Sequence, residues 1–145
     1  AEAVVRTMPQ APPIEHGATG AWYEPIQDVV RMPEPGHFSP LEAYYSTLYH
    51  ELVHSTGHKS RLGRDIGDRV PRFGSTDYSQ EELVAEMGAA FLCGHCGIEQ
   101  ATVENSAAYI QGWLKKLKGD HKLVVIAAAQ AQKAADFIRG IRPAQ

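Results

Sequence analysis

Residues 39–54 read Ser39-Pro40-Leu41-Glu42-Ala43-Tyr44-Tyr45-Ser46-Thr47-Leu48-Tyr49-His50-Glu51-Leu52-Val53-His54. The first four of these residues match a capping box with proline at the first helical position, so we expect a helix to begin there. Apolar residues recur at helical spacing from Tyr44 to Leu52, and Gly57 is expected to end the helix as its C′ residue. The stretch therefore predicts a helix of roughly four to five turns that carries His50 and His54.

The spacing of the two histidines indicates a metal site. His50 and His54 lie four residues apart, so their imidazoles project from one face, about 6 Å apart along the helix axis, and can bind one zinc ion. Glu51 lies about 100° round the helix from His50, where its carboxylate can reach a water on the ion without binding the ion itself. Glu51 is therefore the predicted general base, which takes a proton from the activated water and can pass it to the leaving amine.

A catalytic zinc site needs a third protein ligand and one open position. We favour Glu82, because Glu82 and Glu86 lie four residues apart on one face of the next predicted helix. Glu86 could then accept a hydrogen bond from the free nitrogen of a ligating histidine. Glu81, Glu86 and His58 remain alternative third ligands. Glu82 could instead cap its own helix through a box that begins at Ser79.

The rest of the chain predicts an α+β fold in which a small N-terminal sheet, antiparallel or mixed, packs on the helix of the histidines and a helical half follows. Strands are expected at 14–16, 21–24 and 28–32. Helices are expected at 2–8 and at about 77–95, 105–118 and 120–140. In the helix at 77–95, Leu83, Met87 and Phe91 are expected to form the stripe that faces the core. A long loop at 59–77, rich in glycine, is expected to cover the site.

Length and composition limit the class of protein. With 145 residues, of which 43% are hydrophobic, the chain is expected to form one domain, 1–145. A net charge of −3 gives no reason to expect a nucleic-acid binder, and no apolar run is long enough to span a membrane. Two cysteines, Cys93 and Cys96, favour the reducing cytoplasm. The chain begins without methionine, so we expect a fragment of a larger protein or a processed product.

The tetrapeptide Cys93-Gly94-His95-Cys96 matches the dithiol motif of disulfide isomerases. In those sites the first cysteine begins a helix, and the helix dipole stabilises its thiolate. Here the motif follows Phe91 and Leu92 at the predicted end of a helix, where the dipole opposes a thiolate. We therefore interpret the two cysteines as small, partly buried residues that close the helix.

Several stretches together carry a family resemblance: 44–58, Arg61-Leu62, Phe73-Gly74-Ser75, Tyr78, 81–86, Ala90-Phe91-Leu92, Tyr109-Ile110, Trp113-Leu114 and Ala134-Ala135-Asp136. In these residues the chain resembles the zincin-type metallopeptidase domain of ArdC/TraC-type antirestriction proteins, over most of 10–140. The resemblance implies a gluzincin-like arrangement of His50, His54 and a glutamate from the second helix, with Glu51 catalytic. Such proteins belong to plasmids, phages and other mobile elements, and typically carry an N-terminal domain that binds single-stranded DNA. We expect no counterpart of that domain within residues 1–145, so nucleic acid is not an expected partner of this domain alone.

Two functions follow as hypotheses. The first is a metallopeptidase with one zinc ion per chain, which cleaves a peptide or protein substrate held along the edge of the sheet, expected at 28–32. The second is a metal-stabilised, non-proteolytic module that docks on a restriction, conjugation or other DNA-processing protein. A residue that stabilises the oxyanion is not ranked by sequence, and the candidates are His58, Arg61, Tyr109 and His121.

Overall fold

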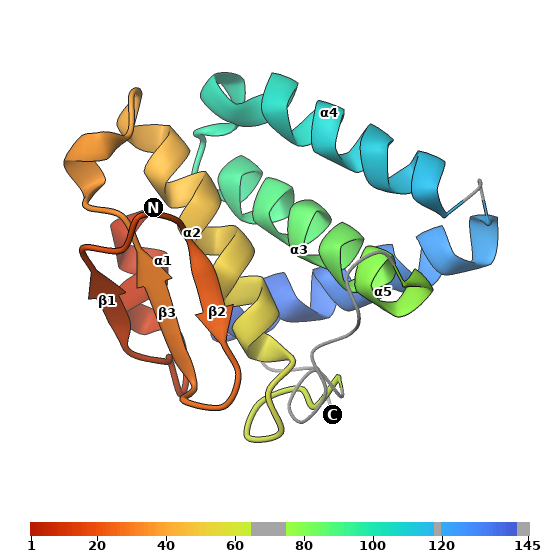
Figure 1. Ribbon diagram of the computed structural model, residues 1–145, viewed down its shortest axis with the longest axis horizontal. Helices are drawn as coiled ribbons and strands as arrows, with labels where there is room; N and C mark the ends of the chain where they lie inside the picture. Colours follow the sequence, from red (N-terminus) through yellow and green to blue (C-terminus); the bar gives the residue numbers. More distant parts are fainter. Residues whose placement is uncertain (65–74, 118–119, 142–145) are drawn as a thin grey trace.

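The computed structural model describes residues 1–64, 75–117 and 120–141 (Figure 1). The strands are β1 (Ile14–His16), β2 (Trp22–Glu24) and β3 (Val29–Met32). The helices are α1 (Glu2–Thr7), α2 (Leu41–Thr56), α3 (Thr76–His95), α4 (Glu99–Lys116) and α5 (His121–Ile138), with a short 3-10 turn, η1 (Pro35–His37), before α2. The predicted α+β fold, a small mixed sheet followed by a mostly helical remainder, is confirmed. None of the helices in the described ranges is long and apolar enough to cross a bilayer.

The sheet has the strand order β1-β3-β2, with β3 parallel to β1 and antiparallel to β2. The prediction that residues 28–32 form an edge is therefore wrong, because β3 is the middle strand of the described sheet. Val29, Val30 and Met32 are all buried, as expected for a strand that is covered on both faces. The outer edge of β2 has no partner strand within the described residues.

Helix α2 carries the two histidines as predicted, although its ends differ in detail. Pro40 is the N-cap residue and not the first helical residue, and no side chain caps the helix, so the predicted capping box is absent. Gly57 does follow the last helical residue, but its φ of −72° is right-handed, so it is not the left-handed C′ glycine we expected. The apolar face of α2 is buried as predicted, with Leu48 and Leu52 inside the core.

The next two helices begin earlier than the sequence indicates. Ser75 is the N-cap of α3, and its hydroxyl accepts a hydrogen bond from the backbone N–H of Tyr78. Ser79 lies inside the helix and is buried, so the alternative role of Glu82 in a Ser79 capping box is wrong. Helix α4 begins at Glu99, several residues before the predicted start at 105.

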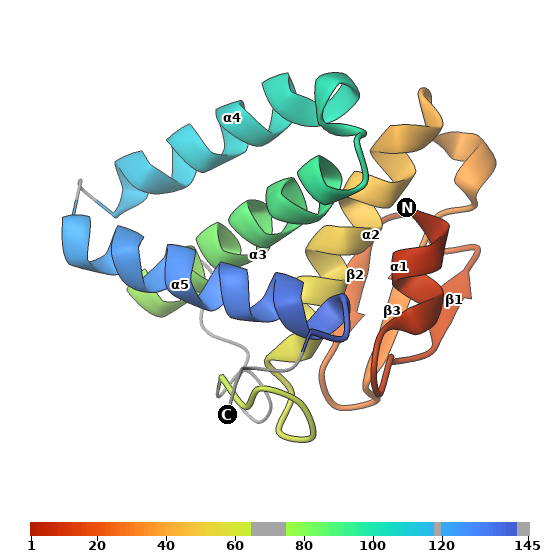
Figure 2. The ribbon, with the colours of Figure 1, turned by 180° about the vertical axis from the view of Figure 1, so that it is seen from behind.

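Helix α3 lies in the middle of the helical half. It packs against α2, α4 and α5, while the sheet lies on the other side of α2 (Figure 1). Seen from behind, α5 crosses the back of α3, and α1 lies beside the sheet (Figure 2). Leu83 is buried and Met87 is half-buried, but Phe91 is 40% exposed, so the predicted core stripe is wrong at its last residue. Small residues such as Ala85 and Ala89 are buried instead, because neighbours cover α3 on several sides.

Gly88 sets how closely α3 approaches α2. A Cβ atom at this position would lie 2.7 Å from Cγ2 of Val53, which is shorter than any normal contact. The side chain of Val53 is fully buried and has little room to move. The glycine therefore lets the two helices approach closely, with the acidic residues of α3 opposite the histidines of α2.

We predict that Gly88→Ala lowers the free energy of unfolding by about 1–3 kcal/mol, because the added methyl group overpacks the contact between α2 and α3. Urea unfolding measures this change. Gly94→Ala in the same helix is the matched control, because nothing lies within 4 Å of the added atom, and it should be neutral or stabilising. A second Val53→Ala substitution should recover part of the loss. Equal effects of Gly88→Ala and Gly94→Ala would contradict the prediction.

Candidate metal centre

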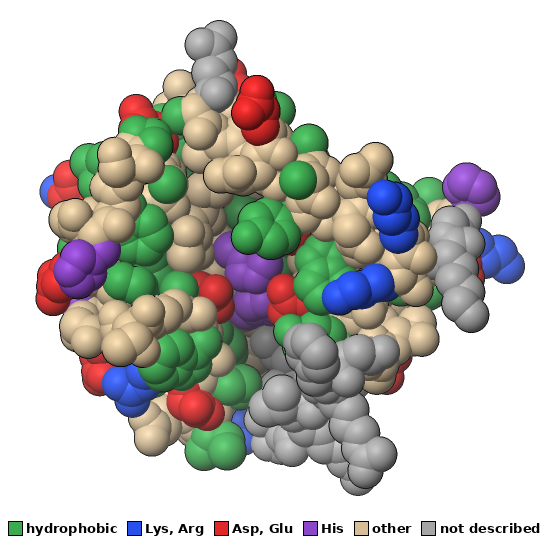
Figure 3. Space-filling model, turned by 45° about the horizontal axis from the view of Figure 1, so that its top comes forward, with side chains coloured by type: hydrophobic (Ala, Val, Ile, Leu, Met, Phe, Trp, Pro, Cys, Tyr) green, Lys and Arg blue, Asp and Glu red, His purple; other side chains and the backbone are tan. Residues whose placement is uncertain are grey.

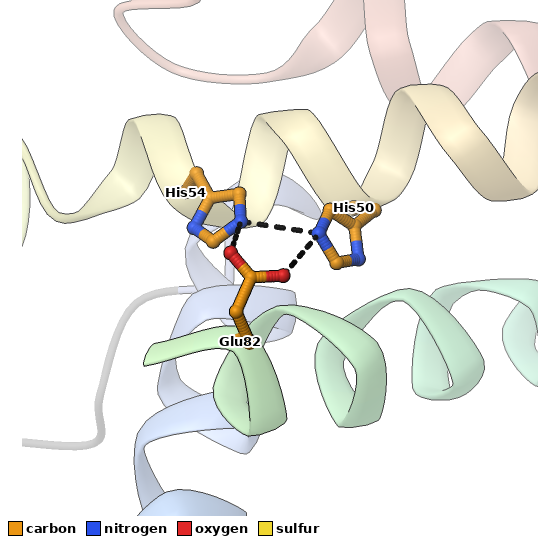
Figure 4. A group of neighbouring side chains, drawn as sticks. All are labelled: His50, His54 and Glu82. Carbon is orange, nitrogen blue, oxygen red and sulfur yellow. Dashed lines mark hydrogen bonds and ion pairs between the residues drawn. The ribbon is translucent and has the colours of Figure 1, made fainter. Parts of the chain in front are cut away.

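Helices α2 and α3 bring three potential ligands together. His50 and His54 project from α2 and Glu82 projects from α3, so that the three side chains point toward one another (Figure 4). The Nε2 atoms of the histidines lie 3.1 Å apart. Oε2 of Glu82 lies 3.3 Å from Nε2 of His50, and Oε1 lies 3.2 Å from Nε2 of His54. One donor atom from each residue lies within 4.8 Å of the other two, which is the spacing that ligands of one ion require.

Each histidine also contacts a second carboxylate through its other ring nitrogen. Nδ1 of His50 lies 3.3 Å from Oε1 of Glu86, and Nδ1 of His54 lies 3.2 Å from Oε1 of Glu81. A carboxylate that accepts from Nδ1–H fixes the ring orientation and leaves Nε2 unprotonated for a metal. Of the four candidate third ligands, the geometry brings Glu82 to both Nε2 atoms and places Glu81 and Glu86 at the Nδ1 atoms.

Arg64 holds Glu81 in place, a contact that the sequence did not predict. Its Nη2 atom donates to Oε1 of Glu81 at 2.8 Å and to the carbonyl oxygen of Val53 at 2.8 Å, and its Nη1 atom donates to Thr56 Oγ1 at 2.6 Å. The guanidinium therefore ties the end of α2 to the start of α3. No periodicity marks Arg64, because it lies in the glycine-rich stretch after α2. Residues 65–74 of the predicted covering loop lie outside the described residues.

The charges of this cluster favour a bound cation. Burial by itself lowers the pKa of His50, but hydrogen bonds to Glu82 and Glu86 outweigh it and raise this pKa to about 9. Burial likewise opposes the positive charge on His54, yet Glu81 and Glu82 raise its pKa to about 10. Burial favours the neutral acid of Glu82, but the two histidines hold its pKa well below the usual range. The carboxylates therefore favour positive charge between them, which either protons or a divalent ion can supply.

The donor set fits such an ion. Two imidazole nitrogens and one carboxylate oxygen are a common ligand set of catalytic zinc, which keeps a further position open. The same donors also accept other divalent metals. His58, the remaining candidate ligand, lies apart from the cluster, and its Nδ1 atom lies 2.8 Å from Oγ of Ser60.

Glu51 lines a cavity of about 340 Å³ that opens beside the cluster. Its side chain is buried, and the cavity is also lined by His50, His54, Glu82 and Tyr78. The other side of the cavity is formed by residues of and around β2, namely Ala21, Trp22, Tyr23 and Pro25. In the space-filling view, histidine side chains lie at the bottom of a hollow with acidic side chains on either side (Figure 3).

Tyr78 is a residue of this cavity that the sequence did not rank for a role. Burial, followed by the charges of Glu82 and Glu51, raises the pKa of its phenol, so the hydroxyl keeps its proton. Of the proposed oxyanion-stabilising residues, Arg61 is bound to Asp28 at 2.7 Å, and His121 lies exposed at the start of α5. Tyr109 lines a neighbouring cavity and not this one.

The two cysteines lie at the C-terminal end of α3. Cys93 is buried in the last turn, Cys96 is the half-buried C-cap residue, and both are free. Burial raises the pKa of the Cys93 thiol, which is the opposite of what a reactive thiolate needs. Cys96 Sγ lies 3.1 Å from the hydroxyl of Tyr49. This environment does not support a thioredoxin-like site.

Comparison with known proteins agrees with this geometry. Residues 1–130 match the family of zincin-like metallopeptidases, and the chain belongs to that family. Two solved structures of the antirestriction protein ArdC from the R388 plasmid are similar over 97% of this chain. The metal-free structure has 39% identity and a TM-score of 0.69, and the Mn(II)-bound structure has 35% identity and a TM-score of 0.67.

Two curated relatives are similar over 86% of the chain. The uncharacterized protein y4eC of Sinorhizobium fredii (strain NBRC 101917 / NGR234) is 38% identical over 125 residues, and the DNA primase TraC of Escherichia coli is 40% identical over 126 residues. The chain spans 40% of the first relative, 12% of the second and about half of ArdC. It therefore corresponds to one part of each of these longer proteins.

We predict that Glu82→Gln weakens metal binding more than Glu86→Gln does, because only Glu82 faces both Nε2 atoms. Loss of a carboxylate that only orients a ligand, as in Glu86→Gln, should cost roughly 10- to 100-fold in affinity. Competition with a chromophoric chelator, with zinc or manganese as the probe, measures these constants. Glu104→Gln on the exposed surface of α4 is the matched control. Wild-type affinity in Glu82→Gln would exclude it as a ligand.

Proposed function

We propose that this chain is the catalytic domain of a zinc-dependent peptidase. The observation that carries the proposal is the convergence of His50, His54 and Glu82 in a cavity that also contains the buried carboxylate of Glu51. We propose one zinc ion per chain, with these three residues as its ligands. The Mn(II)-bound structure of ArdC shows that a relative binds a divalent metal, and His₂Glu donors accept more than one such ion.

The residues around the ion divide the chemistry between them. The ion, when bound, lowers the pKa of a water molecule toward neutrality and polarises the peptide carbonyl. Glu51 does not lie among the ligand atoms but lines the same cavity, so it can accept a proton from that water. The same carboxyl group can then donate the proton to the leaving amine. Glu86 and Glu81 hold the two imidazoles in orientation through their Nδ1 atoms.

Tyr78 is the residue we propose to stabilise the oxyanion. It lies in the cavity with Glu51 and Glu82, and its raised pKa keeps the phenol as a hydrogen-bond donor. A donor aimed at the oxygen where negative charge develops stabilises the transition state more than the ground state.

The substrate is proposed to lie along the outer edge of β2. This edge has no partner strand in the described residues, and residues 21–23 of the same segment line the cavity of Glu51. An extended peptide can pair with such an edge through backbone hydrogen bonds. Because β3 is the middle strand, we propose β2, and not residues 28–32, as the edge that pairs with the substrate.

The alternative is a metal-stabilised module that acts by docking and not by cleavage. It is favoured by the relatives, whose names describe an antirestriction protein and a DNA primase. A restriction or conjugation protein in the cytoplasm would then be the partner. The two functions differ in whether the carboxylate of Glu51 is needed.

We predict that Glu51→Gln abolishes peptide cleavage and leaves folding and zinc content unchanged, because the amide can no longer accept a proton. Zinc-loaded protein is tested on fluorescein-labelled casein and on a quenched fluorescent peptide library. Glu42→Gln, in the first turn of the same helix, is the control and should retain activity. Cleavage by Glu51→Gln at the wild-type rate would contradict the role of the base. Absence of cleavage by the wild type as well would favour the docking module.

We predict that Tyr78→Phe lowers kcat by roughly 10²- to 10³-fold with little change in zinc affinity, because one donor to the oxyanion is lost. Steady-state kinetics on a peptide found in the library screen separates kcat from KM. Tyr109→Phe should have a much smaller effect, because Tyr109 lines the neighbouring cavity. A larger fall in kcat for Tyr109→Phe than for Tyr78→Phe would assign the oxyanion to Tyr109.

A further inference from the structure

A second cavity, of about 300 Å³, lies on the other side of the same active-site residues. Helix α2 contributes Ala43, Ser46 and Thr47 to it, and Glu86 of α3 closes one side. Helix α4 supplies the opposite wall, with Thr102, Asn105, Ser106 and Tyr109.

The two cavities share some of their lining residues. Both are lined by Ala21, which lies just before β2, and by His50 and Glu51. Both cavities therefore border the candidate metal centre. A peptide along β2 with its scissile bond at Glu51 would place side chains on both sides of the centre, one of them at the second cavity.

The lining of the second cavity is mostly polar, and His50 is its one basic side chain among the described residues. Hydroxyl groups come from α2 and α4, an amide comes from Asn105 and carboxylates come from Glu51 and Glu86. Oε1 of Glu86 contacts Nδ1 of His50, and among the described residues Oε2 of Glu86 has no hydrogen-bond or ion-pair partner. The first cavity differs, because Trp22, Tyr23 and Pro25 form its wall. The second cavity thus offers acceptors, and of its two carboxylates Glu86 has accepting capacity to spare at Oε2.

The net charge of the candidate metal centre also favours a cationic ligand in the second cavity. Glu51, Glu81, Glu82 and Glu86 surround the two histidines, and Arg64 is the one cationic side chain that the described residues place in contact with them. With a divalent ion bound, four carboxylates against one guanidinium leave the wild-type centre negative by one charge, and the Glu51→Gln centre is neutral but keeps the carboxylate of Glu86 at the second cavity. A cation next to Glu86 is therefore favoured, and an anion is opposed.

We propose that the second cavity binds the side chain of a lysine or arginine next to the bond that is cleaved. This inference rests on the proposed peptidase function and adds its substrate class. The cationic group would pair with Glu86 and donate hydrogen bonds to Asn105 and to the hydroxyl groups of Thr102 and Ser106. The ring of Tyr109, which is 60% exposed at the wall of the cavity, offers a face for a guanidinium.

Binding to the inactive protein tests the proposal without any need for cleavage. Zinc-loaded Glu51→Gln protein is titrated with fluorescein-labelled alanine octapeptides that carry lysine, arginine, leucine or glutamate at each position in turn. At one position, lysine or arginine should bind roughly 10- to 100-fold more tightly than leucine, as expected for hydrogen bonds to a charged group. Adding Asn105→Lys should remove most of this preference, because it puts a positive charge in the wall of the cavity.

Gln111→Lys is the matched control, because it adds the same charge to an exposed site on α4 that lines neither cavity. The Gln111→Lys variant should still bind the lysine or arginine peptide more tightly than the leucine peptide. Equal binding of lysine and leucine peptides, absence of binding by every peptide, or the same preference in Asn105→Lys would overturn the proposal. The same peptides are then incubated with the wild-type enzyme. Cleavage without a basic preference would support the peptidase and exclude the basic site, whereas basic selection without cleavage would support the site and exclude the peptidase.

Discussion

Two imidazoles on α2 are buried against three carboxylates on α3, and the rest of the structure follows from the need to keep these charges paired. A buried charge without a partner costs several kcal/mol, so the histidines and glutamates must meet with good geometry. Gly88 allows the two helices to approach closely, and Arg64 joins their ends through Glu81. The sheet then covers the other side of α2 and places β2 beside the histidines.

The contacts that hold α2 against α3 also form the candidate metal site. The carboxylates that raise the pKa values of the histidines also make the cluster a candidate binding site for a cation, and the Nδ1 contacts would leave both Nε2 atoms free to bind it. Glu51 belongs to α2 and lines both cavities, where a substrate could reach it. The same helix therefore supplies core packing on one face, the candidate ligands on another and the proposed base between them.

The parts that the sequence predicts are those with a strong local pattern. Helical spacing is sufficient to identify α2 and the face that carries its two histidines. The predicted start of α4 is too late because its buried face contains Thr102 and Ser106, and these polar residues interrupt the apolar pattern. Strand order was also misjudged, because pairing of strands of three or four residues depends on long-range contacts. Arg64 and Tyr78 could not be assigned, because only the folded chain brings them to the site.

The proposed metal site consists of one ion bound by His50, His54 and Glu82. X-ray absorption spectroscopy at the zinc edge, on protein loaded with one zinc per chain, tests it most directly. We expect two imidazole nitrogens at about 2.0–2.1 Å, with oxygen atoms at about 2.0–2.2 Å as the remaining ligands. A sulfur atom at about 2.3 Å, which only Cys93, Cys96 or a methionine could supply, or a spectrum without imidazole scattering would contradict it.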